Sequence, residues 1–105
     1  MPPSSRELIS ALNHPVRRRI LRAYMDPVGT ELSASNLAGR MDLPLANVLY
    51  HVKTLTDLHV ITQTRWESVR GAREIFYAVD VDGRAACLRQ VLDECRAEDE
   101  AEARS

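Results

Sequence analysis

The stretch LPLANVLYHVKTLTDLHV, residues 43–60, decides how this chain is expected to fold. Apolar side chains recur in it at steps of three or four residues: Leu45, Val48, Val52, Leu55 and Leu58, with Leu49 widening the stripe. That spacing is typical of a helix, here over residues 44–58, that buries one face. The opposite face carries polar side chains: Asn47, Tyr50, His51 and Lys53. These side chains must meet either water or a partner.

A second helix precedes this one and completes a two-helix unit. SASNLAGRM, residues 33–41, brings its apolar side chains to one side, with Ser33 or Ser35 as the expected N-terminal cap. The connection DLP offers Asp42 as a further cap candidate and places Pro44 near the start of the next helix. Two helices separated by about three residues, the second with a polar face, form the helix-turn-helix pattern.

Two further helices are expected before this unit and one after it. SSRELISAL, residues 4–12, and PVRRRILRAYM, residues 15–25, are separated by NHP, because the residue before a proline is pushed out of the helical region. In the second of them Arg17 and Arg18 are expected to lie largely outside the apolar side. DGRAACLRQVLDECRAE, residues 82–98, is expected to form the last helix.

Two runs of β-branched and aromatic residues lie between the helices. VITQTRWESV, residues 60–69, and REIFYAVD, residues 73–80, are joined across RGA, where Gly71 supplies the backbone freedom of a tight turn. This pattern predicts a hairpin, with Trp66 and Tyr77 packed under it. The predicted fold is therefore mainly α with a small β-hairpin, in the order α-α-α-α-β-β-α.

The length and the charge distribution divide the chain into a body and a tail. The 105 residues suffice for one hydrophobic core, and we assign that domain to residues 1–92. The body holds twelve Arg and Lys against nine Asp and Glu, whereas DECRAEDEAEARS, residues 93–105, holds two against six. The net charge of -1 thus hides a mildly basic body. The acidic tail has no large apolar side chain, so it is expected to continue the last helix or to fray from it.

Several classes of function lack their usual signals in this sequence. No apolar run approaches the roughly 18 residues of a membrane span, and the start MPPSSRELIS lacks a secretory pattern, so a cytoplasmic protein without a membrane partner is expected. Cys87 and Cys95 form neither CxxC nor a zinc-spaced pair. No glycine-rich phosphate loop and no cluster of nucleophile, base and orienting group indicate an enzyme, and no cofactor is expected.

The order of these elements, with the residues that fill them, resembles the winged helix-turn-helix regulators of the ArsR type. LNHPVRRRILRAY resembles that family's opening segment, ELSASNLAGRMDLPLANVLYHVKTLTDLHVI its two-helix core, and RGAREIFYAVD its second wing strand. Together the fragments cover about residues 6–80, in the family's order. The resemblance implies a winged helix-turn-helix fold and a transcriptional regulator, a dimeric repressor that binds an inverted repeat in double-stranded DNA. Helix 44–58 and the wing 61–79 would make the contacts.

The sequence departs from this family at its two familiar metal sites. Ser33, Ala34 and Ser35 occupy the place where metal-sensing members carry CxC, and hydroxyl groups are poor ligands for soft metals. No histidine occurs in residues 83–105, where other members bind zinc on the last helix. No metal is therefore predicted, and the identity of any small-molecule inducer is left open. His59 is a third departure, because glycine commonly ends the recognition helix there.

By this resemblance the DNA-contacting positions lie on the outer face of helix 44–58 and at the tip of the hairpin: Leu45, Ala46, Asn47, Tyr50, His51, Lys53, Thr54, Arg70 and Arg73. Asn47 can read adenine edges, and Tyr50 can hydrogen-bond or stack. Lys53 and Thr54 lie nearer the DNA backbone and are expected to contact phosphate. The alternative is that these side chains are only the wet side of a core helix.

The remaining candidate positions predict other kinds of contact. Leu45 and Ala46 would meet thymine methyl groups, which predicts binding sites that contain A·T pairs. Arg70 and Arg73 flank the turn of the hairpin and can reach phosphates or a narrow minor groove. His51 has a second interpretation, as a buried and hydrogen-bonded histidine.

Apolar stripes near both ends of the chain predict that two copies pair: Leu8, Ile9, Leu12, Leu88, Val91, Leu92 and Cys95. A single recognition helix makes few base contacts, so specific sites usually consist of two half-sites read by a symmetric dimer. The helix-turn-helix body does not obviously cover both stripes, and the resemblance implies pairing through the terminal helices. The alternative is that both stripes pack on their own chain.

Two other functions are compatible with the same fold. Cys87 and Cys95 are separated by a helical rise of about 12 Å, too far for a bridge within one helix, but they can approach across a dimer axis. A regulator that responds to thiol oxidation is therefore one alternative. The other is a winged-helix module that binds protein, whose DNA affinity would be weak and equal for all sequences.

Overall fold

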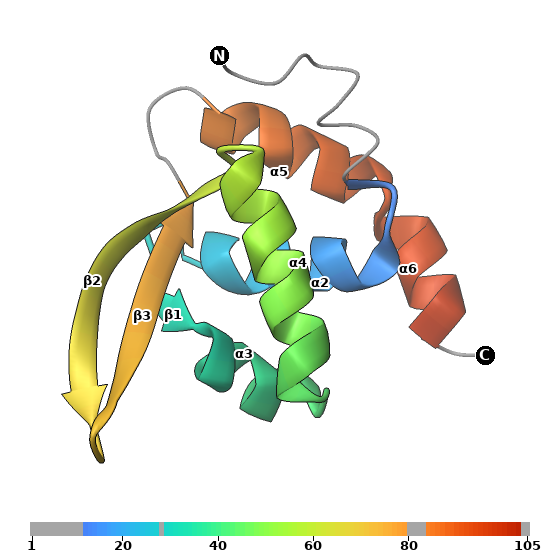
Figure 1. Cartoon of the computed structure of the whole chain (residues 1–105). Helices are drawn as coiled ribbons and strands as arrows, with labels where there is room; N and C mark the ends of the chain where they lie inside the picture. The colour runs from blue at the N-terminus through green and yellow to red at the C-terminus, as the bar shows by residue number, and fades with distance from the viewer. Residues whose placement is uncertain (1–11, 28, 80–83, 104–105) are drawn as a thin grey trace.

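The computed structural model describes residues 12–27, 29–79 and 84–103. Its elements follow in the order α2 (Pro15–Met25), β1 (Leu32–Ser33), α3 (Ala34–Met41), α4 (Leu45–Asp57), β2 (Ile61–Val69), β3 (Ala72–Val79), α5 (Arg84–Glu94) and α6 (Arg96–Ala103) (Figure 1). This mainly helical chain with a small β-hairpin confirms the predicted fold class. The helix expected over residues 4–12 lies, apart from Leu12, outside the described residues.

Helix α2 runs through the middle of the fold and has the bounds that the sequence predicts. His14 caps its start, because the His14 Nδ1 accepts a hydrogen bond from the backbone N–H of Val16 at 3.3 Å. Its buried apolar side chains are Ile20, Leu21, Tyr24 and Met25. Arg18 is buried as well, only 4% exposed, so its expected place outside the apolar side is wrong. The reason is an acidic partner in α6, since a buried charge requires a counter-charge.

The connection between α3 and α4 explains how the two helices are set against each other. Ser33 caps α3, because its Oγ accepts from the backbone N–H of Asn36 while the Asn36 side chain accepts from the Ser33 N–H, both at 3.1 Å. Asp42 takes the left-handed conformation, φ 52°, and ends α3. The next N–H, of Leu43, donates to the carbonyl of Ala38 at 3.1 Å. Asp42 thus closes the first helix and does not cap the second, whose N-cap is Pro44.

His59 ends α4 in the way that glycine would. It takes the left-handed conformation, φ 59°, and its N–H donates to the carbonyl of Thr56 at 3.0 Å. The N–H of Val60 donates to the carbonyl of Leu55 at 2.9 Å, and both of these side chains are buried. These two bonds and the apolar contact form a Schellman motif. The departure at His59 therefore leaves the end of the recognition helix intact.

The sheet has three strands in the order β1-β3-β2, both pairs antiparallel. β2 and β3 form the predicted hairpin, and its two-residue loop places Arg70 and Gly71 at φ 52° and φ 81°. Two consecutive positive φ values are typical of the type I′ turn that tight hairpins prefer. The pairing shifts register between Gln63 and Arg65, which leaves Thr64 as a bulge. Strand β1 is not predicted from the sequence, since two residues are too short for a periodic pattern.

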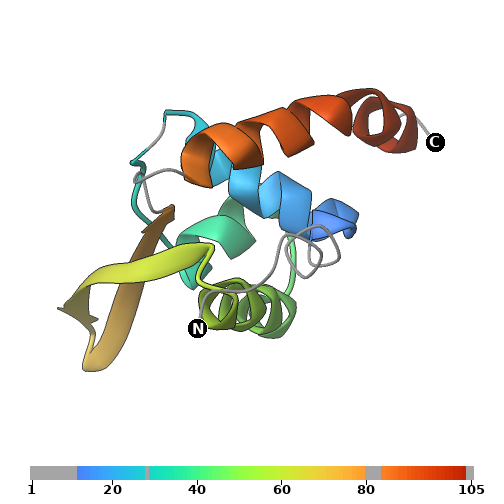
Figure 2. The same ribbon diagram turned by 90° about the horizontal axis from the view of Figure 1, so that it is seen from above.

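The helices are arranged on two sides of α2. Figure 2 shows α4 and the hairpin on one side, with α5 and α6 on the opposite side. Leu21, Leu37, Leu55 and Ile61 form the centre of the core, each with a 0% exposed side chain. The single helix predicted over residues 82–98 is divided at Cys95, and the acidic residues after it form a separate helix, α6. Within the described residues, no helix has both the length and the apolar character to cross a bilayer.

Candidate nucleic-acid interface

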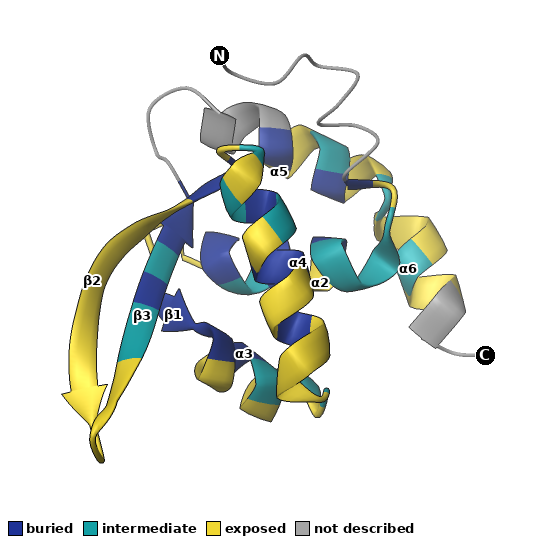
Figure 3. Ribbon diagram, viewed as in Figure 1, coloured by how far each residue is buried: buried dark blue, intermediate teal, exposed yellow. Residues whose placement is uncertain are grey.

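The face of α4 that points away from the core carries most of the predicted DNA contacts (Figure 3). Its exposed side chains are Leu45, Ala46, Asn47, Leu49, Tyr50 and Lys53. Tyr50 is 63% exposed, and its backbone carbonyl accepts from the hydroxyl of the half-buried Thr54 at 3.0 Å. Because α4 carries no carboxylate before Asp57, this face presents a cation, polar groups and apolar surface without acidic charge.

Leu45 and Leu49 do not lie in the buried stripe to which their spacing assigns them. Their side chains are 45% and 49% exposed. Val48, Val52 and Leu55 attach α4 to the core by themselves, since each is at most 2% exposed. Leu49 therefore belongs to the candidate interface, although the sequence does not predict it there. Leu49 lies one helical turn after Leu45, which the family resemblance places on the outer face, and this spacing could have indicated that Leu49 faces outward too.

His51 is buried and hydrogen-bonded, which matches the second interpretation of this residue and not a position on the outer face of α4. It is 8% exposed, and its Nδ1 accepts a hydrogen bond from the Arg17 Nε of α2 at 3.2 Å. Its ring lies 4.7 Å from the ring of His14, which caps α2. Burial, together with the nearby His14 and Arg17, lowers the pKa of His51 below its usual value. The neutral imidazole thus fixes the orientation of the recognition helix on α2.

The hairpin carries arginines in two different states. Arg65 is engaged within the protein: its guanidinium lies 3.8 Å from the Phe76 ring centre, 3.3 Å from the Glu31 carboxylate and against Glu67. Arg70 is exposed at the turn itself and makes no ion pair with the described residues. Only Arg70 and its neighbour Arg73 therefore keep a cation at the tip for a partner.

Trp66 lies on the outside of the hairpin and not under it. Its side chain is 51% exposed, so the expectation that it packs in the core is wrong. The guanidinium of Arg73 covers its ring, with 4.3 Å to the ring centre. The hairpin protrudes from the body, and most of β2 is exposed, so no core surface is available to cover this ring (Figure 3). Tyr77, in contrast, is half-buried and packs against the core as expected.

Three of the predicted dimer residues pack on their own chain. Leu12, Leu88 and Leu92 are 3%, 4% and 4% exposed within one copy, because α5 and the segment before α2 cover α2. The expectation that the body cannot cover these stripes is therefore wrong for them. Val91 and Cys95 are half-buried and keep a surface on α5 and at its end. Leu8 and Ile9 lie outside the described residues, as does the side chain of Cys87.

Ser33, at the position of the CxC motif of metal-sensing relatives, has a structural role in this protein. The Oγ of Ser33 donates to the Glu74 carboxylate of β3 at 2.6 Å, besides capping α3. It thereby connects the first helix of the helix-turn-helix unit to the wing. Among the described residues, no three His, Cys, Asp or Glu side chains lie close enough together to hold a metal ion.

Residues 12–64 of the chain match the family model described as "Helix-turn-helix domain". The chain belongs to this helix-turn-helix family. The matched residues begin three residues before α2 and end within β2, so they include both helices of the unit. No curated protein sequence matches the chain significantly. The family and the fold are those of helix-turn-helix proteins and not of an enzyme.

Solved structures with a similar fold include proteins described as transcriptional regulators. Reduced HlyU from Vibrio cholerae has a TM-score of 0.65 at 21% identity, over 81% of each chain. The transcriptional repressor BigR from Xylella fastidiosa has a TM-score of 0.66 at 18% identity, over 87% of this chain and 82% of its own. ZitR from Lactococcus lactis, solved in complex with DNA, has a TM-score of 0.58 at 12% identity, over 85% of this chain and 56% of its own. The winged helix-turn-helix fold implied by the resemblance to ArsR-type regulators is thereby confirmed.

Proposed function

We propose that this helix-turn-helix protein is a DNA-binding transcriptional regulator that reads double-stranded DNA through α4 and the β2–β3 wing. The observation that carries this proposal is the exposed face of α4 beside a wing tip that holds two arginines. The face reaches solvent at Asn47, Tyr50 and Lys53, and the tip at Arg70 and Arg73. A helix fits the major groove of DNA, and a basic hairpin beside it can reach the backbone or the minor groove.

Each side chain has a role that follows from its chemistry and position. Asn47, near the start of α4, reads an adenine edge with its amide, and Tyr50 hydrogen-bonds or stacks beside it. Lys53 contacts phosphate, as do the two arginines of the wing tip, which together provide affinity without sequence preference. Thr54 is a weaker candidate than the sequence indicates, because its hydroxyl already donates to the Tyr50 carbonyl. His51 positions the helix from within the fold.

The regulator acts as a dimer on an inverted repeat in this proposal. One α4 exposes few base-reading groups, and a symmetric pair doubles them on two half-sites. The surface for pairing lies on the side of α5 and α6, opposite α4, where Val91 and Cys95 remain partly exposed (Figure 2). Leu8 and Ile9, which the sequence also assigns to the interface, lie outside the described residues. Pairing there leaves both recognition helices free for DNA.

Repression follows if the dimer occupies a promoter and blocks the polymerase. The proposed site of action is the cytoplasm. The fold of BigR, a transcriptional repressor, and of ZitR, solved with DNA, supports this proposal. Any small-molecule inducer would enter between the terminal helices of the two copies.

Selection of bound duplexes from sheared genomic DNA tests the proposal. The enriched duplex is then titrated against a scrambled duplex by fluorescence anisotropy at fixed salt. We expect an inverted repeat to bind at least ~1000-fold better than the scrambled sequence. Uniformly weak binding without an enriched sequence would instead identify a winged-helix module that binds protein.

A further inference from the structure

The exposed large apolar side chains of the described residues belong to two elements, α4 and the wing. Among the described residues they are Leu45, Leu49, Tyr50, Trp66 and Val69. Three of the five belong to α4 and two to the wing, and none lies on α2, α3, α5 or α6. Single exposed leucines are ordinary, but three exposed apolar side chains on the outer surface of one helix mark an interaction surface.

Two of these side chains form a strip along α4. Leu45 and Leu49 are four residues apart, so they lie one turn apart on the same edge of the helix. They are 45% and 49% exposed, and the small Ala46 beside them is also exposed. Lys53, one turn further along the same helix, provides a cation, and the wing tip provides the exposed Arg70 and Arg73. A polyanion with apolar groups on its surface matches this combination.

The major groove of DNA offers such a surface where thymines occur. The C5-methyl group of thymine is its one apolar feature, and aliphatic side chains can contact it. Leu45 and Leu49 are separated by a rise of about 6 Å, and base pairs by about 3.4 Å. Two leucines along the groove therefore match methyl groups about two base pairs apart.

We infer that Leu49, together with Leu45, determines sequence specificity by packing against thymine methyl groups two base pairs apart in each half-site. This inference rests on the proposed function and names the bases that this part of the site prefers. It extends the reading face to Leu49, which has no hydrogen-bonding group and is not needed for the core. Asn47, on the other edge of the exposed face, supplies the hydrogen bond that fixes the register.

Replacing thymine by deoxyuridine tests the inference directly, because deoxyuridine keeps the base-pairing edge and lacks only the methyl group. The selected operator is synthesised with deoxyuridine at single thymine positions and at all of them. One methyl group buried against an apolar side chain corresponds to roughly fourfold in affinity. We expect the fully substituted operator to bind at least ~10-fold more weakly, with the loss concentrated at two positions of each half-site.

The variant Leu49→Ala assigns the effect to the side chain. Because Leu49 is exposed and outside the core, the melting temperature of the variant should stay within about 4 °C of that of the unchanged protein. We expect Leu49→Ala to bind the thymine operator more weakly and to lose the distinction between thymine and deoxyuridine at one of the two positions. Gln90→Ala, on the exposed surface of α5, is the control and should keep the full distinction.

The outcomes separate the two proposals. The role of Leu49 is overturned if the operator binds equally well with thymine and with deoxyuridine, or if Leu49→Ala still prefers thymine over deoxyuridine at both positions. Either result leaves the DNA-binding function standing. Absence of any specific duplex overturns both, and assigns the leucine strip to a protein partner. A loss of affinity on methyl removal that disappears in Leu49→Ala supports the inference.

Discussion

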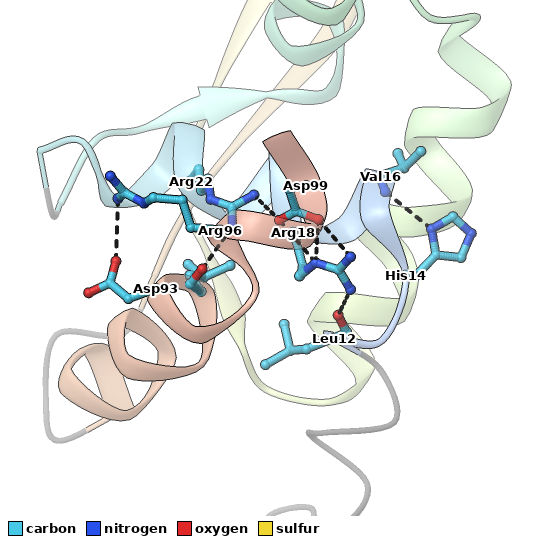
Figure 4. Close-up of polar contacts among 9 residues, drawn as sticks. Leu12, His14, Val16, Arg18, Arg22, Asp93, Arg96 and Asp99 are labelled. Carbon is cyan, nitrogen blue, oxygen red and sulfur yellow. Dashed lines mark hydrogen bonds and ion pairs between the residues drawn. The ribbon is translucent and has the colours of Figure 1, made fainter. Parts of the chain in front are cut away.

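The guanidinium of Arg18 donates to the carboxylate of Asp99 at 2.7 Å, across 81 residues of the chain (Figure 4). The same guanidinium donates to the Leu12 carbonyl at 2.9 Å, and Arg22 lies 2.5 Å from the second oxygen of Asp99. Arg18 is only 4% exposed, so these bonds replace the water that the cation loses on folding. One carboxylate of the acidic region thus joins α6 to α2.

Asp99→Asn should destabilise the protein by about 3 kcal/mol, because it leaves the buried Arg18 charge without its counter-ion. Arg18 lowers the pKa of Asp99, so the carboxylate is ionised at neutral pH. Urea unfolding at neutral pH measures the loss. Glu100→Gln, an exposed position of the same helix, is the matched control and should change the free energy of unfolding by less than about 0.5 kcal/mol. Equal losses for the two variants would show that the Arg18 charge is solvated.

His51 should make the protein less stable in mild acid. Its pKa in the folded state is lowered from 6.5, so the unfolded chain binds the proton more tightly than the folded one. The contribution of neutral His51 is complete above about pH 6.5 and is lost as the pH falls through that value toward the folded pKa. We expect the free energy of unfolding, measured in urea, to fall more between about pH 7.5 and 5.5 for the wild type than for His51→Gln.

A direct measurement complements this comparison. The ring protons of His51 followed by NMR should titrate with a midpoint below 6.5. A midpoint at or above that value would mean that burial of the ring beside His14 and Arg17 does not hold the imidazole neutral in solution.

The local periodicity was sufficient to predict most of the elements. Pro15–Met25 is observed with the predicted bounds, because a proline start and an apolar stripe are local signals. The hairpin and its turn followed from β-branched residues around Gly71. The helix-turn-helix unit was likewise recognisable from spacing alone, with its capping serine.

The differences arise where burial depends on residues distant in sequence. Arg18 is buried because Asp99 lies 81 residues further along the chain, and His51 because Arg17 lies 34 residues before it. Leu49 has the spacing of a core residue. Periodicity, however, shows where the buried face of a helix is centred and not how far around the helix it extends. Trp66 has the composition of a core residue, yet the hairpin protrudes beyond the body. A single sequence does not reveal these long-range relationships.

Trp66, the only tryptophan of the chain, should report on the wing. Because it is 51% exposed, its fluorescence maximum in the native protein should be close to that of the unfolded protein. Addition of the selected duplex should quench or blue-shift the emission as the wing approaches the DNA. A strongly blue-shifted emission without DNA would show that the hairpin is covered, for example by a second copy.

Asn47→Ala should weaken binding to the operator by about 1–3 kcal/mol, the scale of one good base contact. Asn47 is exposed, so the variant should unfold at nearly the same urea concentration as the wild type. Binding to scrambled DNA should be unchanged, since the amide reads a base and not phosphate. Anisotropy titrations with both duplexes measure the two affinities. An unchanged operator affinity would remove Asn47 from the reading face.

Arg70→Asn should weaken binding to operator and scrambled DNA by the same factor. Arg70 occupies the left-handed first position of the two-residue turn, before Gly71, and Asn-Gly is a favoured pair in such turns. The variant therefore removes the charge without straining the wing. The slope of log affinity against log salt should decrease by about 1 for each arginine–phosphate pair that the substitution removes. Titrations at several salt concentrations measure it, and a weakening confined to the operator would mean that Arg70 reads groove shape or bases and not phosphate.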